Sequence, residues 1–88
     1  MAYRVELKPS AAKALARLPR RDQRRVARKI DALAENPRPN AARKLSGADA
    51  LYRVRAGDYR ILYQVQDDVL LVLVVRIGHR RDVYRNLS

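Results

Sequence analysis

The feature of this chain that most restricts its fold is a change in the spacing of its apolar residues. Between residues 9 and 35 they recur every three or four positions, which is the period of an amphipathic helix. In residues 3–7 and again in 51–66 they alternate with polar residues, which is the period of a half-buried strand. One strand, a helical region and then several strands predict an α+β domain.

The helical region divides into two helices at Pro19, because the residue before a proline is pushed out of helical geometry. The first helix has apolar residues at Ala11, Ala14, Leu15 and Leu18. The second runs to about residue 35, with one apolar side formed by Val26, Ile30 and Leu33. Nearly opposite lies a basic side formed by Arg21, Arg24, Arg25 and Arg28.

Three further strands are predicted after a loop over residues 36–50, which has one helical turn at most. In the first of them Arg53 and Arg55 share the face away from the core, and Arg60 projects from the outer face of the second. Residues 69–77 are apolar on both sides except Arg76, which predicts a strand in the sheet interior. We therefore expect an antiparallel sheet of about four strands packed against an N-terminal helical hairpin, ending in a short basic turn.

The charge of the chain indicates a polyanionic partner. It has 20 basic against 9 acidic residues and a formal net charge of +11, which attracts and steers anions. All but four of the basic residues are arginine, which binds phosphate bidentately and stacks on bases. With 88 residues the chain forms one domain, residues 1–88, because a second core would be too small to be stable.

Other classes of protein are excluded by what the sequence lacks. There is no cysteine and only one histidine, so we expect no disulfide, no thiol nucleophile, no metal site and no cofactor. Residues 1–8 do not read as a signal peptide, and the longest apolar run is too short to span a bilayer. We expect a cytoplasmic protein that does not engage a membrane.

Three segments of the second half resemble a known family. They are residues 52–55 (Tyr-Arg-Val-Arg), residues 57–63 (Gly-Asp-Tyr-Arg-Ile-Leu-Tyr) and residues 76–84 (Arg-Ile-Gly-His-Arg-Arg-Asp-Val-Tyr). Together they are similar to the C-terminal half of RelE-type toxins in the RelE/ParE superfamily. The first half matches the order of elements in that family, although its side chains are generic.

The resemblance implies a type II toxin that enters the ribosomal A site, cleaves mRNA and is held inactive by a protein antitoxin. In the family, basic residues on two strands and near the C-terminus surround the scissile phosphate, and a C-terminal tyrosine orients the RNA. The positions that match here are Arg53, Arg55, Arg60, Arg80 and Tyr84. Attack by the RNA's own 2′-hydroxyl requires no metal.

The general base is left open by one departure from the family. Arg53 and Arg55 stand where the best-known member has lysine, and an arginine does not give up its proton at accessible pH. His79, Asp82 and Tyr84 are the nearby candidates, and His79 has the most suitable unperturbed pKa, about 6.5.

Each of these assignments has a simpler alternative. His79 can be a solvated or core-packed imidazole, Arg60 a surface arginine, and Tyr84 a residue that only packs the C-terminal turn. The basic helix residues, with Arg81, can contact RNA or an acidic antitoxin, or can simply be solvated. At the level of function, the alternatives are a ParE-like poison of DNA gyrase and a non-catalytic module that binds RNA or the ribosome.

Overall fold

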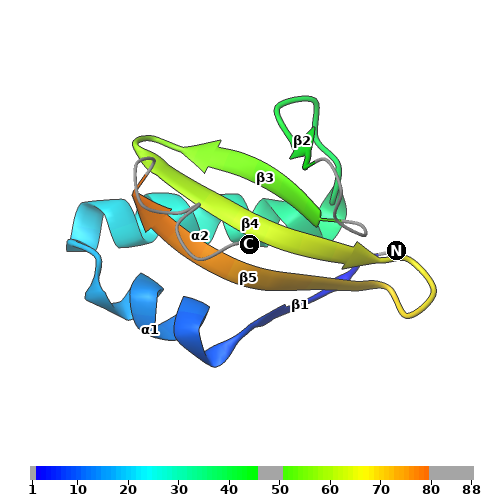
Figure 1. Cartoon of the computed structure of the whole chain (residues 1–88), viewed down its shortest axis with the longest axis horizontal. Helices are drawn as coiled ribbons and strands as arrows, with labels where there is room; N and C mark the ends of the chain where they lie inside the picture. Colours follow the sequence, from blue (N-terminus) through cyan, green and yellow to red (C-terminus); the bar gives the residue numbers. More distant parts are fainter. Residues whose placement is uncertain (1, 46–50, 80–88) are drawn as a thin grey trace.

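The computed structural model describes residues 2–45 and 51–79, which form a five-stranded sheet with two helices packed on one face (Figure 1). The elements follow in the order β1 (Arg4–Leu7), α1 (Pro9–Arg17), α2 (Arg20–Glu35), β2 (Arg43–Lys44), β3 (Leu51–Ala56), β4 (Tyr59–Gln66) and β5 (Leu71–His79). The predicted α+β class and the helical hairpin are therefore confirmed. Neither helix has the length and apolar character that crossing a bilayer requires.

The sheet differs from the predicted one in two respects. Its strand order is β1-β5-β4-β3-β2, so it has five strands, because residues 43 and 44 pair with β3 inside the segment predicted as a loop. The first strand runs parallel to β5, whereas the other neighbours are antiparallel. A parallel partner follows from the crossover through the two helices, which carries the chain back to the end of the sheet where it began.

The core lies between the sheet and the helices. Val26, Ile30 and Leu33 of α2 are buried, as the helical spacing predicts. They belong to one cluster with Ala11 of α1 and with alternate residues of the strands, among them Val54, Ile61, Tyr63, Val65, Val72, Val74 and Ile77. This face of the sheet is called the inner face below, and the other is the outer face.

A β-bulge in β5 changes which residues reach the outer face. Tyr63 pairs with Val74 and Leu62 pairs with Arg76, so Val75 is an extra residue without a partner in β4. Val74 and Ile77 both belong to the core, three positions apart instead of two or four. The bulge thus lets Ile77 face the core and turns Arg76 outward, which is a common role of bulges next to functional sites.

Candidate active site

Three of the predicted site residues lie together on the outer face of the sheet. Arg55 of β3 is directly opposite Arg60 of β4, and Arg53 is opposite Leu62, one step further along the same two strands. Residues directly opposite each other in an antiparallel pair point to the same face, with their Cβ atoms roughly 5 Å apart. Arg53, Arg55 and Arg60 therefore form one cluster, called the outer arginine cluster below.

The pairing of Arg55 with Arg60 is electrostatically unfavourable. Like charges that are directly opposite in a sheet repel each other and destabilise it. Neither residue forms an ion pair with a carboxylate among residues 2–45 and 51–79. An anion bound between the two guanidinium groups would relieve this repulsion.

Arg60 has a second unusual property. Its side chain is half-buried, and its Nε atom is buried without a hydrogen-bond partner among the described residues. A buried donor that makes no hydrogen bond costs about 1–3 kcal/mol, so such groups are rare outside functional sites. An acceptor supplied by a ligand, such as a phosphate oxygen, would satisfy it.

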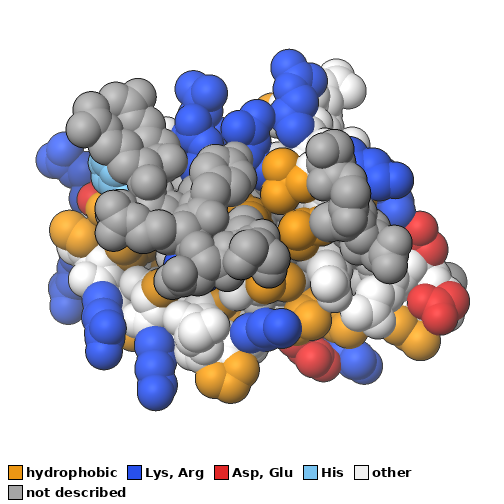
Figure 2. Space-filling model, in the orientation of Figure 1, with side chains coloured by type: hydrophobic (Ala, Val, Ile, Leu, Met, Phe, Trp, Pro, Cys, Tyr) orange, Lys and Arg blue, Asp and Glu red, His pale blue; other side chains and the backbone are white. Residues whose placement is uncertain are grey.

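Two arginines that the sequence interpretation did not include extend the cluster. Arg43 of β2 is opposite Arg53, and Arg76 of β5 is opposite Leu62, so a row across four strands contains three arginines. Figure 2 shows Lys and Arg side chains gathered along the β2 and β3 margin of this face. Arg76 could not be assigned from alternation alone, because only the bulge at Val75 places it outward.

His79 lies on the other side of the sheet from the outer arginine cluster. It is opposite Tyr59, whose neighbour Ile61 is in the core, and the two rings meet edge to face with centroids 6.0 Å apart. The Tyr59 hydroxyl donates a hydrogen bond to Asp22 at 3.4 Å. Burial and the nearby Asp22 carboxylate raise the pKa of Tyr59. At this position the His79 ring can pack against Tyr59. A role for His79 in proton transfer beside Arg60 fits less well, because Arg60 lies on the other face of the sheet.

The C-terminal candidates Arg80, Arg81, Asp82 and Tyr84 lie outside the described residues. Their predicted roles therefore rest on the sequence resemblance. Residue 79, the last described one, ends the strand that neighbours β4, and Gly78 is opposite Arg60. Within the described part of the chain, no group of His, Asp and Glu side chains could hold a metal ion.

The basic side of α2 is divided between two grooves. One groove, of about 580 Å³, lies between α2 and the end of β3, and its lining includes Arg21, Arg25 and Arg28 together with Arg55. Arg24 instead lines a groove of about 370 Å³ between the two helices, with mostly apolar neighbours. The predicted stripe of four arginines is therefore not one continuous surface.

The arrangement can bind and polarise a phosphate but cannot by itself remove a proton. Guanidinium groups stay protonated and offer several donors in one plane, which match the oxygens of a phosphate. Converging on one phosphate, they would stabilise the negative charge that develops on it during transfer. The outer arginine cluster thus suits electrostatic catalysis at phosphorus.

Comparison with known proteins identifies the family. A family model described as the ParE toxin of the type II toxin-antitoxin system, parDE, matches residues 5–84. The mRNA interferase toxin RelE of Escherichia coli K12 is 32% identical, over 91% of this chain and 85% of that protein. A chain of the archaeal RelE-RelB complex from Pyrococcus horikoshii OT3 has a TM-score of 0.82 and 33% identity, covering 94% of this chain and 100% of its own. A chain of the intact E. coli RelBE toxin-antitoxin complex has a TM-score of 0.78 and 30% identity, over 89% and 96% of the two chains. The chain therefore belongs to the RelE/ParE superfamily of type II toxin-antitoxin toxins.

Proposed function

We propose that this toxin is a ribosome-dependent endoribonuclease that cleaves mRNA in the ribosomal A site. The observation that carries the proposal is the Arg55–Arg60 pair, in which two like charges face each other and one buried donor has no partner among the described residues. The E. coli relative named mRNA interferase toxin RelE supports the same activity.

In the proposed reaction the RNA supplies its own nucleophile. The 2′-oxygen attacks the adjacent phosphorus while the bond from phosphorus to the 5′-oxygen breaks, which leaves a 2′,3′-cyclic phosphate and a 5′-hydroxyl. Arg60, with Arg53 and Arg55, stabilises the charge on the pentacoordinate phosphate and holds the in-line geometry. Arg76 is added to this set, because it lies in the same row as Arg53.

Two protons must move in this reaction, one from the 2′-hydroxyl and one to the departing 5′-oxygen. Arginine does not act as a base at accessible pH. Asp82 and Tyr84 remain the candidates for proton transfer, and Tyr84 is also the residue proposed to stack on the RNA. Arg80 is proposed as a further phosphate ligand, by resemblance to the family.

We also propose that a cognate antitoxin inhibits this chain. Solved relatives are complexes of RelE with RelB, from Pyrococcus horikoshii and from E. coli. A net charge of +11 gives an acidic or amphipathic partner a strong electrostatic attraction. Co-expression with the product of a neighbouring short reading frame should restore growth that the toxin alone prevents.

The experiment that tests the activity is single-turnover cleavage of mRNA on programmed ribosomes, with the ends of the products identified. We expect a 2′,3′-cyclic phosphate and a 5′-hydroxyl, with full activity in EDTA. Arg60→Ala should fold and reduce the rate on the order of a hundredfold or more. Wild-type cleavage by the folded variant would contradict the assignment.

A parallel assay of DNA breakage by gyrase is required, because the matching family model carries the ParE name. Gyrase-dependent breakage without mRNA cleavage would replace the proposed activity with that of a gyrase poison. Ribosome binding without either reaction would indicate a docking module.

A further inference from the structure

The groove between α2 and the end of β3 is strongly cationic. It measures about 580 Å³, and five of the residues that line it are basic: Arg21, Arg25, Arg28, Lys29 and Arg55. The others are two alanines and a glycine, so the described lining of the groove has no carboxylate and no large apolar side chain. It is called the basic groove below.

The charges of the basic groove are not neutralised within the described part of the protein. None of its five basic residues forms an ion pair there, whereas Arg38, elsewhere in the chain, is bound to Asp67. Five cations around one cavity repel each other, and water and salt screen this repulsion in part, because all of them except Lys29 are exposed. A bound anion would remove this cost.

Gly57 leaves space for one of these cations. It lies in the β3–β4 turn with a φ of +62°, a conformation that favours glycine. A Cβ atom built there would be 3.3 Å from Cδ of Arg25 and would overlap a terminal nitrogen of its guanidinium. The absence of a side chain at residue 57 therefore lets Arg25 lie against the turn and line the groove.

Arg55 connects the basic groove to the outer arginine cluster. It lines the groove and is also directly opposite Arg60. The short strand β2 pairs with Tyr52 and Arg53, and no other strand formed by residues 2–45 or 51–79 covers the edge of β3 at Arg55. A chain of phosphates bound at Arg60 can therefore continue around this edge towards α2.

We infer that the basic groove binds the phosphodiester backbone of RNA and that Gly57 positions Arg25 for this contact. The inference rests on the proposed function for the identity of the polyanion. The planar guanidinium group of arginine donates two parallel hydrogen bonds to phosphate oxygens. Such contacts to the RNA backbone need no apolar anchor. The uncharged residues of the described lining are only Ala32, Ala56 and Gly57, so the groove offers little to the apolar anchors of a protein partner.

The test measures binding of a single-stranded RNA oligonucleotide at several salt concentrations, in an Arg60→Ala background so that the RNA stays intact. Arg25→Ala and Arg28→Ala should each weaken binding several-fold and reduce the slope of log affinity against log salt by about 0.7, the value for one phosphate contact with a single strand. Arg20→Ala is the matched control. It removes the same charge from the same helix, but Arg20 does not line the groove.

The role of Gly57 has its own variant. Asparagine tolerates a positive φ, so Gly57→Asn keeps the turn while placing a Cβ against Arg25. We expect Gly57→Asn to weaken binding less than Arg25→Ala, because a displaced Arg25 keeps its charge, and to cause no further change when the two are combined. Additive effects of the two substitutions would overturn the positioning role.

The same variants separate the two possible sources of the phosphates. Weaker binding to the free oligonucleotide assigns the groove to the mRNA strand, and weaker binding to empty ribosomes alone assigns it to ribosomal RNA; both support the inference. It is overturned if Arg25→Ala and Arg28→Ala match Arg20→Ala with both ligands, or if only antitoxin binding changes. If the wild type does not cleave mRNA but the groove variants still lose RNA binding, the proposed activity is refuted. The inference that the basic groove binds RNA then still holds.

Discussion

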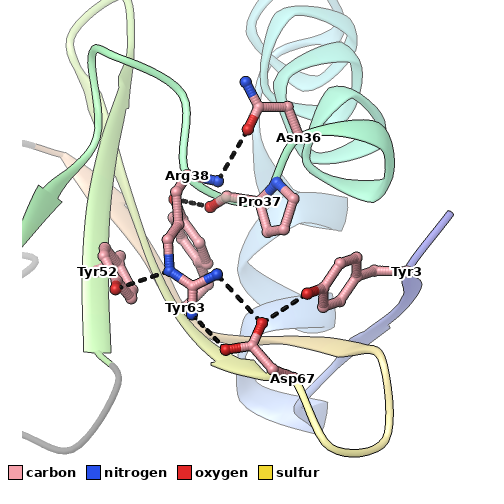
Figure 3. Close-up of polar contacts among 7 residues, drawn as sticks. All are labelled: Tyr3, Asn36, Pro37, Arg38, Tyr52, Tyr63 and Asp67. Carbon is pink, nitrogen blue, oxygen red and sulfur yellow. Dashed lines mark hydrogen bonds and ion pairs between the residues drawn. The ribbon is translucent and has the colours of Figure 1, made fainter. Parts of the chain in front are cut away.

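Arg38 binds both carboxylate oxygens of Asp67, with nitrogen-to-oxygen distances of 3.1 and 2.7 Å (Figure 3). The same carboxylate accepts a hydrogen bond of 2.5 Å from the Tyr3 hydroxyl. Arg38 Nε also donates to the Tyr52 hydroxyl at 2.9 Å. These four side chains join the N-terminal segment, the segment after α2, β3 and the β4–β5 turn at one end of the sheet.

Asp67→Asn should reduce stability at neutral pH and have a smaller effect in acid. Hydrogen bonds from Arg38, and then from Tyr3, lower the pKa of the Asp67 carboxyl. A lowered pKa in the folded state adds stability above the usual carboxyl pKa, and this stability is lost as the pH falls through the folded-state value. Urea unfolding at neutral and acidic pH measures both effects.

The neighbouring Asp68 provides the control for that substitution, because it is exposed and forms no ion pair with Arg38. Asp68→Asn should therefore leave the acid dependence unchanged. Cleavage should also survive Asp67→Asn, since Asp67 follows the last residue of β4 and Arg60 is near its first, roughly 24 Å away at the rise of an antiparallel strand. An equal loss of stability in Asp67→Asn and Asp68→Asn would show that the ion pair between Arg38 and Asp67 does not stabilise the fold.

Tyr63→Phe should reduce stability at neutral pH. It should also reduce the decline in stability that the wild type shows in alkali. The ring of Tyr63 is fully buried, and its hydroxyl donates to the carbonyl of Pro37 at 2.8 Å. Losing this bond leaves a buried carbonyl unpaired, at a cost of about 1–3 kcal/mol. Burial also raises the pKa of Tyr63 from 10.0 to about 12.

A raised tyrosine pKa makes the folded state more stable below the usual value, and this contribution is lost as the pH rises through the folded-state value. The wild type should therefore lose stability between pH 10 and 12. Tyr63→Phe should show a smaller decline over the same range when unfolding by urea is followed by circular dichroism. An unchanged alkaline profile would assign the decline to other groups.

Deletion of Val75 should be tolerated, although it shortens a strand in the interior of the sheet. Val75 is the extra residue of the bulge, so its removal lets Leu62 and Tyr63 keep Arg76 and Val74 as partners in a regular ladder. Deletion of Leu62 is the control, because it removes a fully buried side chain and reverses the faces of the residues on one side of it. The two proteins should differ clearly in thermal unfolding, and collapse of both would contradict the assignment of the bulge.

Local periodicity predicted most of the fold because each strand with one buried face alternates in its own sequence. The alternation over residues 51–66 predicts strands there with Arg60 on an outer face, and both features are confirmed in β3 and β4. β2 could not be predicted, since two residues carry no period. The parallel pairing of β1 with β5 also leaves no local signal, because it depends on where the two helices return the chain.

The site was predictable where alternation is regular and not where it is interrupted. Arg53 and Arg55 lie on the predicted face, because β3 and β4 pair without a break along their whole shared length. Beyond Val75 the bulge reverses the alternation of β5, which moves Arg76 to the outer face and His79 to the inner one. The Arg38–Asp67 ion pair joins two loops, and loops have no periodic pattern from which it could be predicted.

Arg60→Met should make the protein more stable and less active. Methionine keeps much of the length of the side chain, removes the charge that faces Arg55 and removes the buried Nε donor that has no partner among the described residues. Relief of a cross-strand repulsion is worth about 0.2–1 kcal/mol. The same change removes a donor from the proposed phosphate site, so cleavage on ribosomes should fall on the order of a hundredfold or more.

Two controls distinguish this trade-off from a general effect of removing charge from a basic protein. Arg20 lies in helix α2 and so has no opposite residue on a neighbouring strand. Arg20→Met removes an equal charge, but it should change stability less than Arg60→Met and should not affect cleavage. Arg55→Met should also stabilise the fold, and the double variant should gain less than the sum of the single ones, because either substitution alone ends the repulsion. Urea unfolding and single-turnover cleavage of the same preparations measure both quantities. If Arg60→Met proves less stable than the wild type, the Arg55–Arg60 pair stabilises the fold and is not evidence of a ligand site.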